Sequence, residues 1–436
     1  MTDGHDTIFA VASGAGRAAI TVFRISGPGS GAMLDRLWRR RPPARLASLR
    51  LLRDHSDTVI DKAIVIWLPG PRSFTGEDGA ELHLHGGRAV LRDVAAALVE
   101  LGLRPAEPGE FARRAFLNGR IDLVEAEAIA DLVEAETTAQ RRQALRQMEG
   151  GLGALLGGWA MTLTFLLAQQ EALIDFPDED LPPEVDDALL QSLRRLFDEL
   201  RAHLDDGRRG ERLRDGLVFA IVGVPNAGKS TLVNELAQRD IAIVSPLPGT
   251  TRDVLEARIE LAGVPVTLLD TAGLRAAADS IEAEGVRRAR ARAANADVLI
   301  VLETPTEPAP DDLAPHPRTI RVTAKADLLP AETAAAAGDL RISARTGLGM
   351  KAFLAQLAEH ARALTQAEGP PPLTRARHRA ALLQAADHLS AALAAPQPEL
   401  RAEDLRMALR AIGRITGRVG VEDILDSVFH QFCIGK

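Results

Sequence analysis

Short runs in which apolar and polar residues alternate fill the first 118 positions, a pattern that is typical of β-strands. Three such runs predict strands at 8–11, 19–25 and 62–68, and clusters of Pro, Gly and Arg separate them. A longer segment at 89–102 predicts a helix. We therefore expect a small α+β domain at 1–118.

From residue 121 the apolar residues follow a helical period instead. One apolar stripe, with four glutamates largely outside it, consists of Leu123, Val124, Ile129, Leu132 and Val133. Helical character continues through 155–174, and a proline-rich break at 177–183 precedes another predicted helix at 184–204. The segment 119–213 therefore predicts a helical domain that is incomplete by itself.

Strands and helices alternate from 217 to about 363, which indicates one α/β unit. A Gly-Pro-Pro-Pro linker at 369–372 follows, and the chain is helical again to its end. The simplest arrangement is an insertion, because an inserted domain with close termini lets the helical parts 119–213 and 369–436 pack together. The predicted fold class is multidomain α+β and α/β, with the α/β domain inserted at 214–368.

Composition narrows the classes of function. The 436 residues suggest two to four domains, and 46% apolar residues are normal for a globular protein. Aromatic residues make up 3% with no Tyr, which argues against stacking many bases on aromatic rings. A net charge of −8 argues against indiscriminate coating of nucleic acid, although a local basic groove can still hold an RNA.

The single cysteine, Cys433, excludes an internal disulfide framework. Residues 1–6 lack the apolar region of a secretory signal, and no run approaches the ~20 apolar residues of a membrane span. The last four residues make a poor prenylation box because Gly and Lys end it. We therefore expect a cytoplasmic protein with no membrane partner.

A phosphate-binding loop follows the strand-like run 218–222. Residues 223–230 match G-x-x-x-x-G-K-S, and a helix opens at Thr231. In this setting backbone N–H groups wrap the phosphates, Lys229 supplies charge to the β- and γ-phosphates, and the Ser230 hydroxyl is placed for Mg²⁺. An ordinary glycine-rich turn is the alternative, and the Lys-Ser pair disfavours it.

A second strand, 264–269, ends in Asp270, which matches the Mg²⁺-side aspartate of P-loop NTPases. Gly273 would then present a backbone N–H to the γ-phosphate. Between these elements lies Thr251, which can coordinate Mg²⁺ only when the γ-phosphate is present. This predicts a loop that GTP orders and hydrolysis releases.

Base selection is expected at 324–327, after a strand-like run at 319–323. The Asp327 carboxylate can accept two hydrogen bonds from guanine that adenine does not offer. Ala324 stands where GTPases normally place Asn, which weakens the expectation of tight or strict guanine binding. Lys325 remains, and the residues placed to close over the base are Ser343, Ala344 and Arg345.

Leu274 follows the Asp270 motif at the position where Ras-like proteins hold the Gln that orients water. Since an apolar side chain cannot orient water, another group must do so. Glu282, in the following stretch, can orient the water, and Asn226 in the phosphate loop can help to hold a cation. A Glu that is merely solvated is the alternative interpretation.

Together these motifs resemble the tRNA modification GTPases of the MnmE (TrmE) family, among the TrmE-Era-EngA-YihA-Septin-like GTPases, over nearly the whole chain. In the N-terminal part the resemblance rests on segments 6–8, 24–27, 73–78, 85–87 and 109–111. It continues through 114–118, 122–123, 125–129, the G-domain motifs and the terminal Phe-Cys-Ile-Gly-Lys at 432–436. The terminal pentapeptide and the segment 73–78 are the most specific parts.

The resemblance implies a folate-binding N-terminal domain, a helical domain and an inserted Ras-like G domain. Members of the family act with an FAD-dependent partner enzyme of the MnmG type, in a heterotetramer. Together they attach an aminomethyl or carboxymethylaminomethyl group at carbon 5 of the wobble uridine, position 34, of certain tRNAs. The carbon comes from a 5-formyltetrahydrofolate-type carrier. The family's G domains dimerise across the nucleotide, and K⁺ takes the place of an arginine finger.

The resemblance also implies roles for matching residues. Glu282 would orient water, and Cys433 is a candidate nucleophile or proton donor in the uridine reaction, although a free Cys is more often a small buried hydrophobe. The potassium ligands would be Asn226, Ser245, Thr250 and the Leu247 carbonyl. The folate ligands would be Arg24, Glu81, Arg120 and Lys436. The positions expected to contact GTP are Asn226, Ala227, Gly228, Lys229, Ser230, Thr231, Ser245, Pro246, Leu247, Pro248, Gly249, Thr250, Thr251, Asp270, Thr271, Ala272, Gly273, Lys325, Asp327, Ser343, Ala344 and Arg345.

Two further features and two further functions stay open. His83 and His85 beside Glu81 suggest a metal site, but a polar strand face lining the folate pocket is favoured because no third or fourth ligand accompanies them. The basic pairs at 208–209 and 287–288 can touch tRNA or simply face water.

A ribosome-assembly or regulatory GTPase switch is the main alternative function, and a stand-alone folate-binding or one-carbon transfer protein is another. Folate binding by residues 1–120 alone would separate the enzyme from the switch.

Overall fold

The computed structural model describes residues 6–14, 16–38, 40–175, 183–224, 226–238, 256–270, 295–308, 316–330, 340–366, 369–419, 425, 428–430, 432 and 435, without the side chains of 183–185. The chain divides into two compact units. Unit 1 comprises 1–130, 148–160 and 409–436, and unit 2 comprises 131–147 and 161–408.

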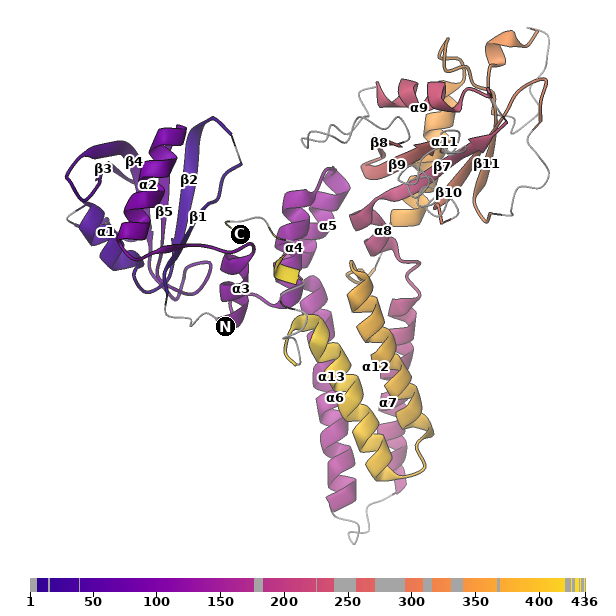
Figure 1. Ribbon diagram of the computed structural model, residues 1–436. Helices are drawn as coiled ribbons and strands as arrows, with labels where there is room; N and C mark the ends of the chain where they lie inside the picture. Colours follow the sequence, from indigo (N-terminus) through magenta and orange to yellow (C-terminus); the bar gives the residue numbers. More distant parts are fainter. Residues whose placement is uncertain are drawn as a thin grey trace, which may run out of the picture. The chain divides into compact units, whose positions relative to one another are not determined.

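A six-stranded sheet forms the N-terminal part of unit 1 (Figure 1), with the strand order β3-β4-β5-β2-β1-β6. The strands are β1 (Ile8–Val11), β2 (Ala18–Ser26), β3 (Ser48–Arg53), β4 (Val59–Leu68), β5 (Gly79–Gly86) and β6 (Arg104–Pro105). Helices α1 (Ser30–Trp38) and α2 (Arg88–Glu100) pack against one core that includes Phe23, Val65 and Leu82. The side chains that alternate with these core residues point to the opposite face, which the two helices leave open.

The predicted strands and the helix at 89–102 are present with shifts of a few residues, whereas α1, β3, β6 and the helix Glu110–Leu117 were missed. In β3, Leu49 and Leu51 are 58% and 47% exposed, whereas the next residue, Leu52, is fully buried in the sheet core. The leucines of β3 therefore lie on both faces of the sheet, and the sequence pattern does not show which face is buried.

The helical part of unit 1 contains α3 (Glu110–Leu117), the start of α4 (Leu123–Glu134) and the start of α6 (Gly151–Asp175). A reciprocal capping box begins α4, because the Asp122 N–H donates to Glu125 Oε2 and the Glu125 N–H donates to Asp122 Oδ1, both at 2.7 Å. Burial, reinforced by the nearby Glu125 charge, raises the pKa of Asp122. A Cβ on Gly153 would lie 2.5 Å from Asp122 Oδ2, so a larger residue there would require the Asp122 carboxylate to shift.

Outside the inserted domain, the helices of unit 2 are α5 (Thr138–Met148), most of α6, α7 (Pro183–Leu204), α8 (Arg209–Asp215), α12 (Ala376–Ala394) and most of α13 (Pro398–Thr416). Helices α7 and α12 run side by side (Figure 1). Arg401 of α13 joins α6 and α7, since its Nη1 donates to Gln170 Oε1 at 3.2 Å and to Asp186 Oδ1 at 2.5 Å.

Helix α6 corrects one expectation from the sequence. Among the described residues it is the one helix whose length and composition would suffice to cross a membrane. Only 28% of its most apolar window is buried. The expectation that no run reaches this length and apolar character was therefore wrong. A helix of this kind also occurs inside proteins that never enter a membrane, so the finding is weak evidence for a span.

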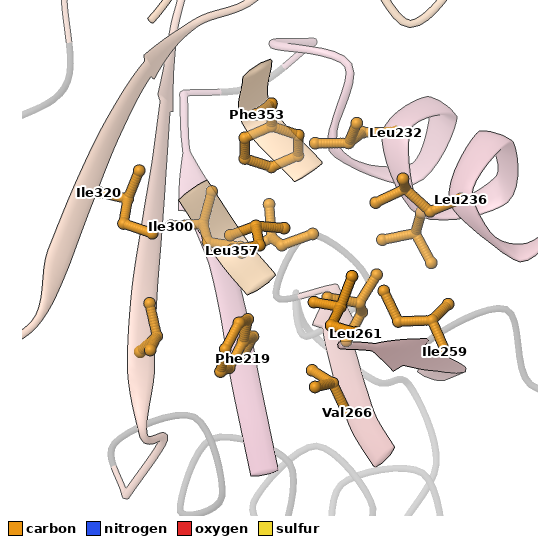
Figure 2. Packing of buried hydrophobic residues seen from close by; sticks show 14 of the residues in the cluster. Phe219, Leu232, Leu236, Ile259, Leu261, Val266, Ile300, Ile320, Phe353 and Leu357 are labelled. Atoms are coloured by element: carbon orange, nitrogen blue, oxygen red, sulfur yellow. The ribbon is translucent and has the colours of Figure 1, made fainter. Parts of the chain in front are cut away.

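The inserted α/β domain has a five-stranded sheet with the order β11-β10-β7-β9-β8, in which only the β8–β9 pair is antiparallel. The strands are β7 (Leu217–Gly223), β8 (Glu256–Leu261), β9 (Val264–Asp270), β10 (Val298–Glu303) and β11 (Thr319–Thr323). Figure 2 shows apolar side chains of the sheet packed with those of α9 (Lys229–Ala237) and α11 (Met350–Thr365). The predicted strand–loop–helix alternation is confirmed here.

Candidate functional site

The carboxyl ends of four parallel strands meet at one edge of the inserted sheet. Ile221 of β7 pairs with Asp270 of β9, and Gly223 pairs with Leu302 of β10. The order of strands reverses at β7, and in open α/β sheets ligands bind at such a switch point beyond the carboxyl ends. The phosphate loop, Asp270 and the base-selecting segment after β11 all follow these strand ends.

Backbone geometry fits the loop after β7 to bind phosphate. Gly223 has φ 152°, and a Cβ there would lie 2.1 Å from the Leu302 carbonyl oxygen, so glycine is required for strand packing. Gly228 has φ 95° with open space around it, which lets the loop turn into α9. Asn226 also takes a left-handed conformation, with φ 58°. The first amides of α9 then face the loop, as an anion site requires.

The two charged residues expected at the phosphates are both buried. Lys229 is 6% exposed, and its Nζ donates to the carbonyl oxygens of Gly223 at 2.9 Å and Val224 at 2.8 Å. Asp270 is 3% exposed, and its Oδ2 accepts a hydrogen bond from Ser230 Oγ. The structure therefore brings together a cation for phosphate and a hydroxyl–carboxylate pair, and hard oxygen ligands of this kind suit Mg²⁺.

The base-selecting segment lies beside the closing loop. The Ala326 N–H donates to the Ile342 carbonyl at 2.9 Å, and Lys325 has φ 56°. A hydrogen bond from the Ser343 side chain lowers the pKa of Asp327, which favours the carboxylate that guanine needs. Ala324 is 5% exposed and belongs to the same apolar core as Ala227 of the phosphate loop. A methyl group thus fills the place where an Asn would supply polar contacts.

The nucleotide site is expected to bind GTP more tightly than ATP, by a moderate factor. Asp327 is exposed in the structure, so the base itself must desolvate the carboxylate before a mismatch costs free energy. We expect ATP to bind about tenfold or more weakly than GTP, and Ala324→Asn to tighten GTP binding. Competition of both nucleotides against a fluorescent GDP measures this, and equal competition by ATP would remove the guanine assignment.

Several sequence-predicted residues lie outside the described residues, and their placement stays untested. They are Ser245, Pro246, Leu247, Pro248, Gly249, Thr250, Thr251, Thr271, Ala272, Gly273, Leu274, Glu282, Cys433 and Lys436, together with the basic pair at 287–288.

A second polar site lies on the face of the N-terminal sheet opposite α1 and α2, beside the place where Phe111 packs on Ile8 and Ala10. Arg24 and Glu81 are cross-strand partners, and Arg24 Nη2 lies 3.5 Å from Glu81 Oε1. The Arg24 guanidinium also lies 5.6 Å from the Phe74 ring centroid and 5.9 Å from that of Phe111. Its Nη1 donates to the Gly435 carbonyl at 3.5 Å, so the end of the chain reaches this site. Arg24 and Glu81, predicted to bind folate, are therefore together.

The two histidines of β5 bind different carboxylates. His83 Nε2 lies 3.4 Å from Glu81 Oε2, whereas His85 Nδ1 lies 2.7 Å from Asp61 Oδ1. The described residues contain no group of three His, Cys, Asp or Glu side chains that could hold a metal ion. This arrangement favours the polar strand face over the metal site.

Arg120 lines an open groove of about 570 Å³ at the end of α3. Its stem lies against the segment that carries Phe74, since a Cβ on Gly76 would be 3.2 Å from Arg120 Cγ. The Asn118 side-chain amide donates to the Thr75 carbonyl at 2.7 Å, which fixes the same segment. The segment 74–76 therefore joins Arg120 to the surroundings of Arg24.

An ionic network, which sequence reasoning did not assign, supports this site. Arg104 binds both oxygens of Glu110, at 2.8 and 2.6 Å, and Arg114 Nη2 binds Glu110 Oε1 at 2.9 Å. Asp6 binds both arginines, and Arg114 also contacts Glu77 at 3.3 Å. One signal in the sequence could have revealed this network. Each of four segments that carry the family resemblance contributes a charged residue to it: 6–8, 73–78, 109–111 and 114–118.

Replacing Glu110 is expected to destabilise the N-terminal sheet. Burial by itself would raise the pKa of Glu110, but hydrogen bonds from Arg104, the Glu107 N–H and Arg114 outweigh it and hold the pKa below its ordinary 4.5. Because the folded-state pKa is depressed, this stability is present above pH 4.5 and is lost as pH falls below it. Glu110→Gln should cost about 3 kcal/mol at pH 7.

Urea unfolding followed by tryptophan fluorescence, to which the buried Trp67 of this sheet contributes, measures the change. Glu107→Gln is the matched control, because Glu107 is exposed three residues away. Equal stabilities of the Glu110→Gln and wild-type proteins at pH 7 would show that the network does not support the sheet.

Comparison with known proteins gives consistent matches. A family model described as "MnmE helical domain" matches residues 123–433, and one described as "GTP-binding protein TrmE N-terminus" matches residues 7–120. The chain is 60% identical over 433 residues to the tRNA modification GTPase MnmE of Gluconacetobacter diazotrophicus, with 98% of each chain covered. It is 57% identical over 439 residues to that of Granulibacter bethesdensis, covering 99% of this chain and 100% of the relative.

Solved structures offer weaker likenesses. The G domain of FeoB from Methanococcus jannaschii is 19% identical, with 34% of this chain and 98% of that chain covered, and the TM-score is 0.23. This likeness is too slight to support an inference about function.

Proposed function

Because the chain belongs to the MnmE family of tRNA modification GTPases, we propose that it is the potassium-dependent GTPase of a two-protein system that modifies the wobble uridine of tRNA. The partner would be an FAD-dependent enzyme, and the added carbon would come from a folate. The single observation that supports GTP hydrolysis best is the buried Lys229 beside the Ser230–Asp270 pair at the carboxyl edge of the sheet. In the proposed reaction Lys229 neutralises phosphate charge, and Ser230 and Asp270 hold Mg²⁺.

The phosphate loop is also suited to a second cation. Asn226 sits in the loop with a left-handed backbone, one residue before the buried Ala227. A monovalent cation bound there would lie near the charge that develops between the β- and γ-phosphates, where a guanidinium acts in other GTPases. In this proposal Asn226, Ser245, Thr250 and the Leu247 carbonyl hold K⁺.

GTP turnover is expected to rise at least about tenfold in K⁺ compared with Na⁺ at equal ionic strength, since the cation stabilises transition-state charge. Asn226→Ala should lose this rise while keeping GTP binding. Phosphate release measured in both salts decides it, with Asn234→Ala, on α9, as the control variant. Equal wild-type rates in K⁺ and Na⁺ would contradict the proposed role of the cation.

The N-terminal unit is proposed to bind the folate. Arg24 and Glu81 offer a cation and a carboxylate on one sheet face, and Arg120 adds a cation. Cationic groups suit the anionic tail of a folate, and a carboxylate suits the amino groups of its pterin ring. Lys436, which the family resemblance adds, completes the proposed set.

The same open face also suits a homodimer. Leu49, Leu51 and Ile64 are 58%, 47% and 41% exposed, and Leu49 pairs with Ile64 across β3 and β4. A second copy of the chain on this face would bury these side chains and cover an exposed sheet. The G domains of the two copies would then associate only when GTP orders their loops.

Reconstitution tests the proposed reaction directly. The purified chain, the partner enzyme, GTP, K⁺ and a folate labelled with ¹³C in its one-carbon unit are incubated with unmodified tRNA. We expect the label at carbon 5 of the wobble uridine by mass spectrometry of nucleosides. A regulatory switch without modification chemistry would hydrolyse GTP and leave every uridine unlabelled.

A further inference from the structure

Helix α8 connects the inserted domain to the helices of unit 2. The connection is short, because Gly216 is the single residue between α8 and β7. On the side of the inserted domain, Arg212 Nε lies 2.9 Å from Asp297 Oδ1. Asp297 Oδ2 in turn accepts the Val218 N–H at 3.0 Å. Since Asp297 immediately precedes β10, one carboxylate ties α8 to the amino-terminal ends of β7 and β10, at the sheet edge opposite the phosphate loop.

On the helical side, a buried carboxylate fixes the middle of α8. Glu211 is 2% exposed, and its Oε1 accepts a hydrogen bond from Arg379 Nε of α12 at 2.5 Å. Arg379 also donates to Asp206 Oδ1 at 2.5 Å and to the Leu204 carbonyl at 2.7 Å. This guanidinium therefore holds α8, α12 and the end of α7 in one arrangement.

The last turn of α8 is held in the same way. Asp131 Oδ1 accepts from Arg214 Nε at 2.8 Å and from Arg375 Nη2 at 2.6 Å, just before α12 begins. From α5, Gln140 donates to the Arg214 carbonyl at 2.9 Å and Gln143 donates to the Gly210 carbonyl at 3.0 Å. Both faces of the helix are thus bonded to helical segments.

The return connection from the inserted domain is less constrained at Gly369. It leaves α11 and passes Gly369, which has φ 115°, before three prolines. A Cβ on Gly369 would have no atom within 4 Å. Buried ion pairs add little net stability but fix geometry, because a misplaced partner leaves a buried charge unpaired. Such pairs surround α8. The return connection has open space at Gly369 but packs against α8 three residues later, where a Cβ on Gly210 would lie 2.4 Å from the Leu373 carbonyl oxygen and 2.8 Å from Pro372 Cβ.

We propose that α8 is the mechanical relay through which the nucleotide state of the phosphate loop acts on α5 and α12. The relay rests on the proposed function, in which GTP hydrolysis drives a reaction elsewhere in the protein. A shift of β7 and β10 would move α8 as a rigid body, and Glu211 and Asp131 would pass that motion to Arg379 and Arg375. The contacts supply the physical connection, and the experiment measures the coupling.

The test compares two insertions in the full-length chain. One variant carries two extra glycines between Asp215 and Gly216, and the matched control carries them between Gly369 and Pro370. Hydrogen exchange of the α12 amides is compared between GDP and a non-hydrolysable GTP analogue. We expect a nucleotide-dependent difference in the wild type and in the control, and none in the first variant, with GTP hydrolysis within about threefold of wild type in both.

A point variant gives a second test in case the insertion variant does not fold. Arg379→Gln keeps the length of the side chain and removes its charge, and Arg195→Gln, on the exposed side of α7, is its control. Arg379→Gln should shrink the nucleotide-dependent difference in α12, whereas Arg195→Gln should not. An unchanged difference in both the insertion and Arg379→Gln variants, or no difference in the wild type, would overturn the relay. If hydrogen exchange of α12 depends on the nucleotide but the protein modifies no tRNA, the proposed function is overturned and the relay is not.

Discussion

Lys229→Ala is expected to lower kcat/KM for GTP by about two to three powers of ten. The ammonium is 6% exposed and is held inside the phosphate loop by two backbone carbonyls, Gly223 and Val224. Removing it takes away the one side-chain cation that the described phosphate loop provides for the β- and γ-phosphates. Loss of a preorganised group that stabilises transition-state charge has effects of this size.

The measurement is steady-state phosphate release together with nucleotide binding by fluorescence. Lys351→Ala is the matched control, because Lys351 is exposed on α11 and is not part of the phosphate loop. The control should hydrolyse GTP at the wild-type rate. A Lys229→Ala protein within threefold of wild type would show that GTP does not bind at this loop.

Glu282→Ala is expected to slow hydrolysis by about two to three powers of ten while GTP binding stays normal. Leu274 cannot orient water, and the family resemblance gives that role to Glu282. Both residues lie outside the described residues, so the prediction rests on matching position. Glu284→Ala, two residues away, is the control.

The dimer is measured in the same samples. Light scattering without nucleotide should already give a dimer mass. A distance probe on the two G domains should shorten with a transition-state mimic and K⁺, and not with GDP. Glu282→Ala should keep both properties. A monomer in solution, or a G-domain distance that ignores nucleotide, would contradict the proposed dimer and leave the phosphate loop assignment standing.

The nucleotide site was predictable from sequence because its parts are local. The phosphate loop needs glycines, Lys and Ser at fixed spacing, and the structure shows why: Gly223 avoids the Leu302 carbonyl and Gly228 takes a positive φ. Asp270 was found because it ends a buried strand. Its short approach to Ser230, by contrast, depends on the pairing of β7 with β9, which no spacing along the chain reveals.

The N-terminal site was predictable only through the family resemblance. Arg24 and Glu81 are 57 residues apart, and antiparallel pairing of β2 with β5 brings them together. The network of Asp6, Glu110 and Arg114 likewise joins segments more than a hundred residues apart. Charged residues usually face water, so sequence alone gave no reason to bury these.

Two features of the fold, the strand β3 and the apolar character of α6, were not correctly predicted from the sequence, and each has a physical reason. Leu49 and Leu51 of β3 are exposed while Leu52 is buried, so an apolar side chain in this strand does not identify the core face. In α6 the apolar residues continue around the helix, and its length sufficed for a membrane span where none was expected. In both elements apolar residues lie where the described chain does not cover them, and only the three-dimensional structure separates such positions from a core.

The most direct test of tRNA modification is analysis of tRNA nucleosides from cells that lack this protein. The account predicts that aminomethyl-type modification at carbon 5 of the wobble uridine disappears. It should return with the wild-type gene and with the Lys351→Ala variant, but not with Lys229→Ala. Unchanged wobble uridines in cells without the protein would contradict the account.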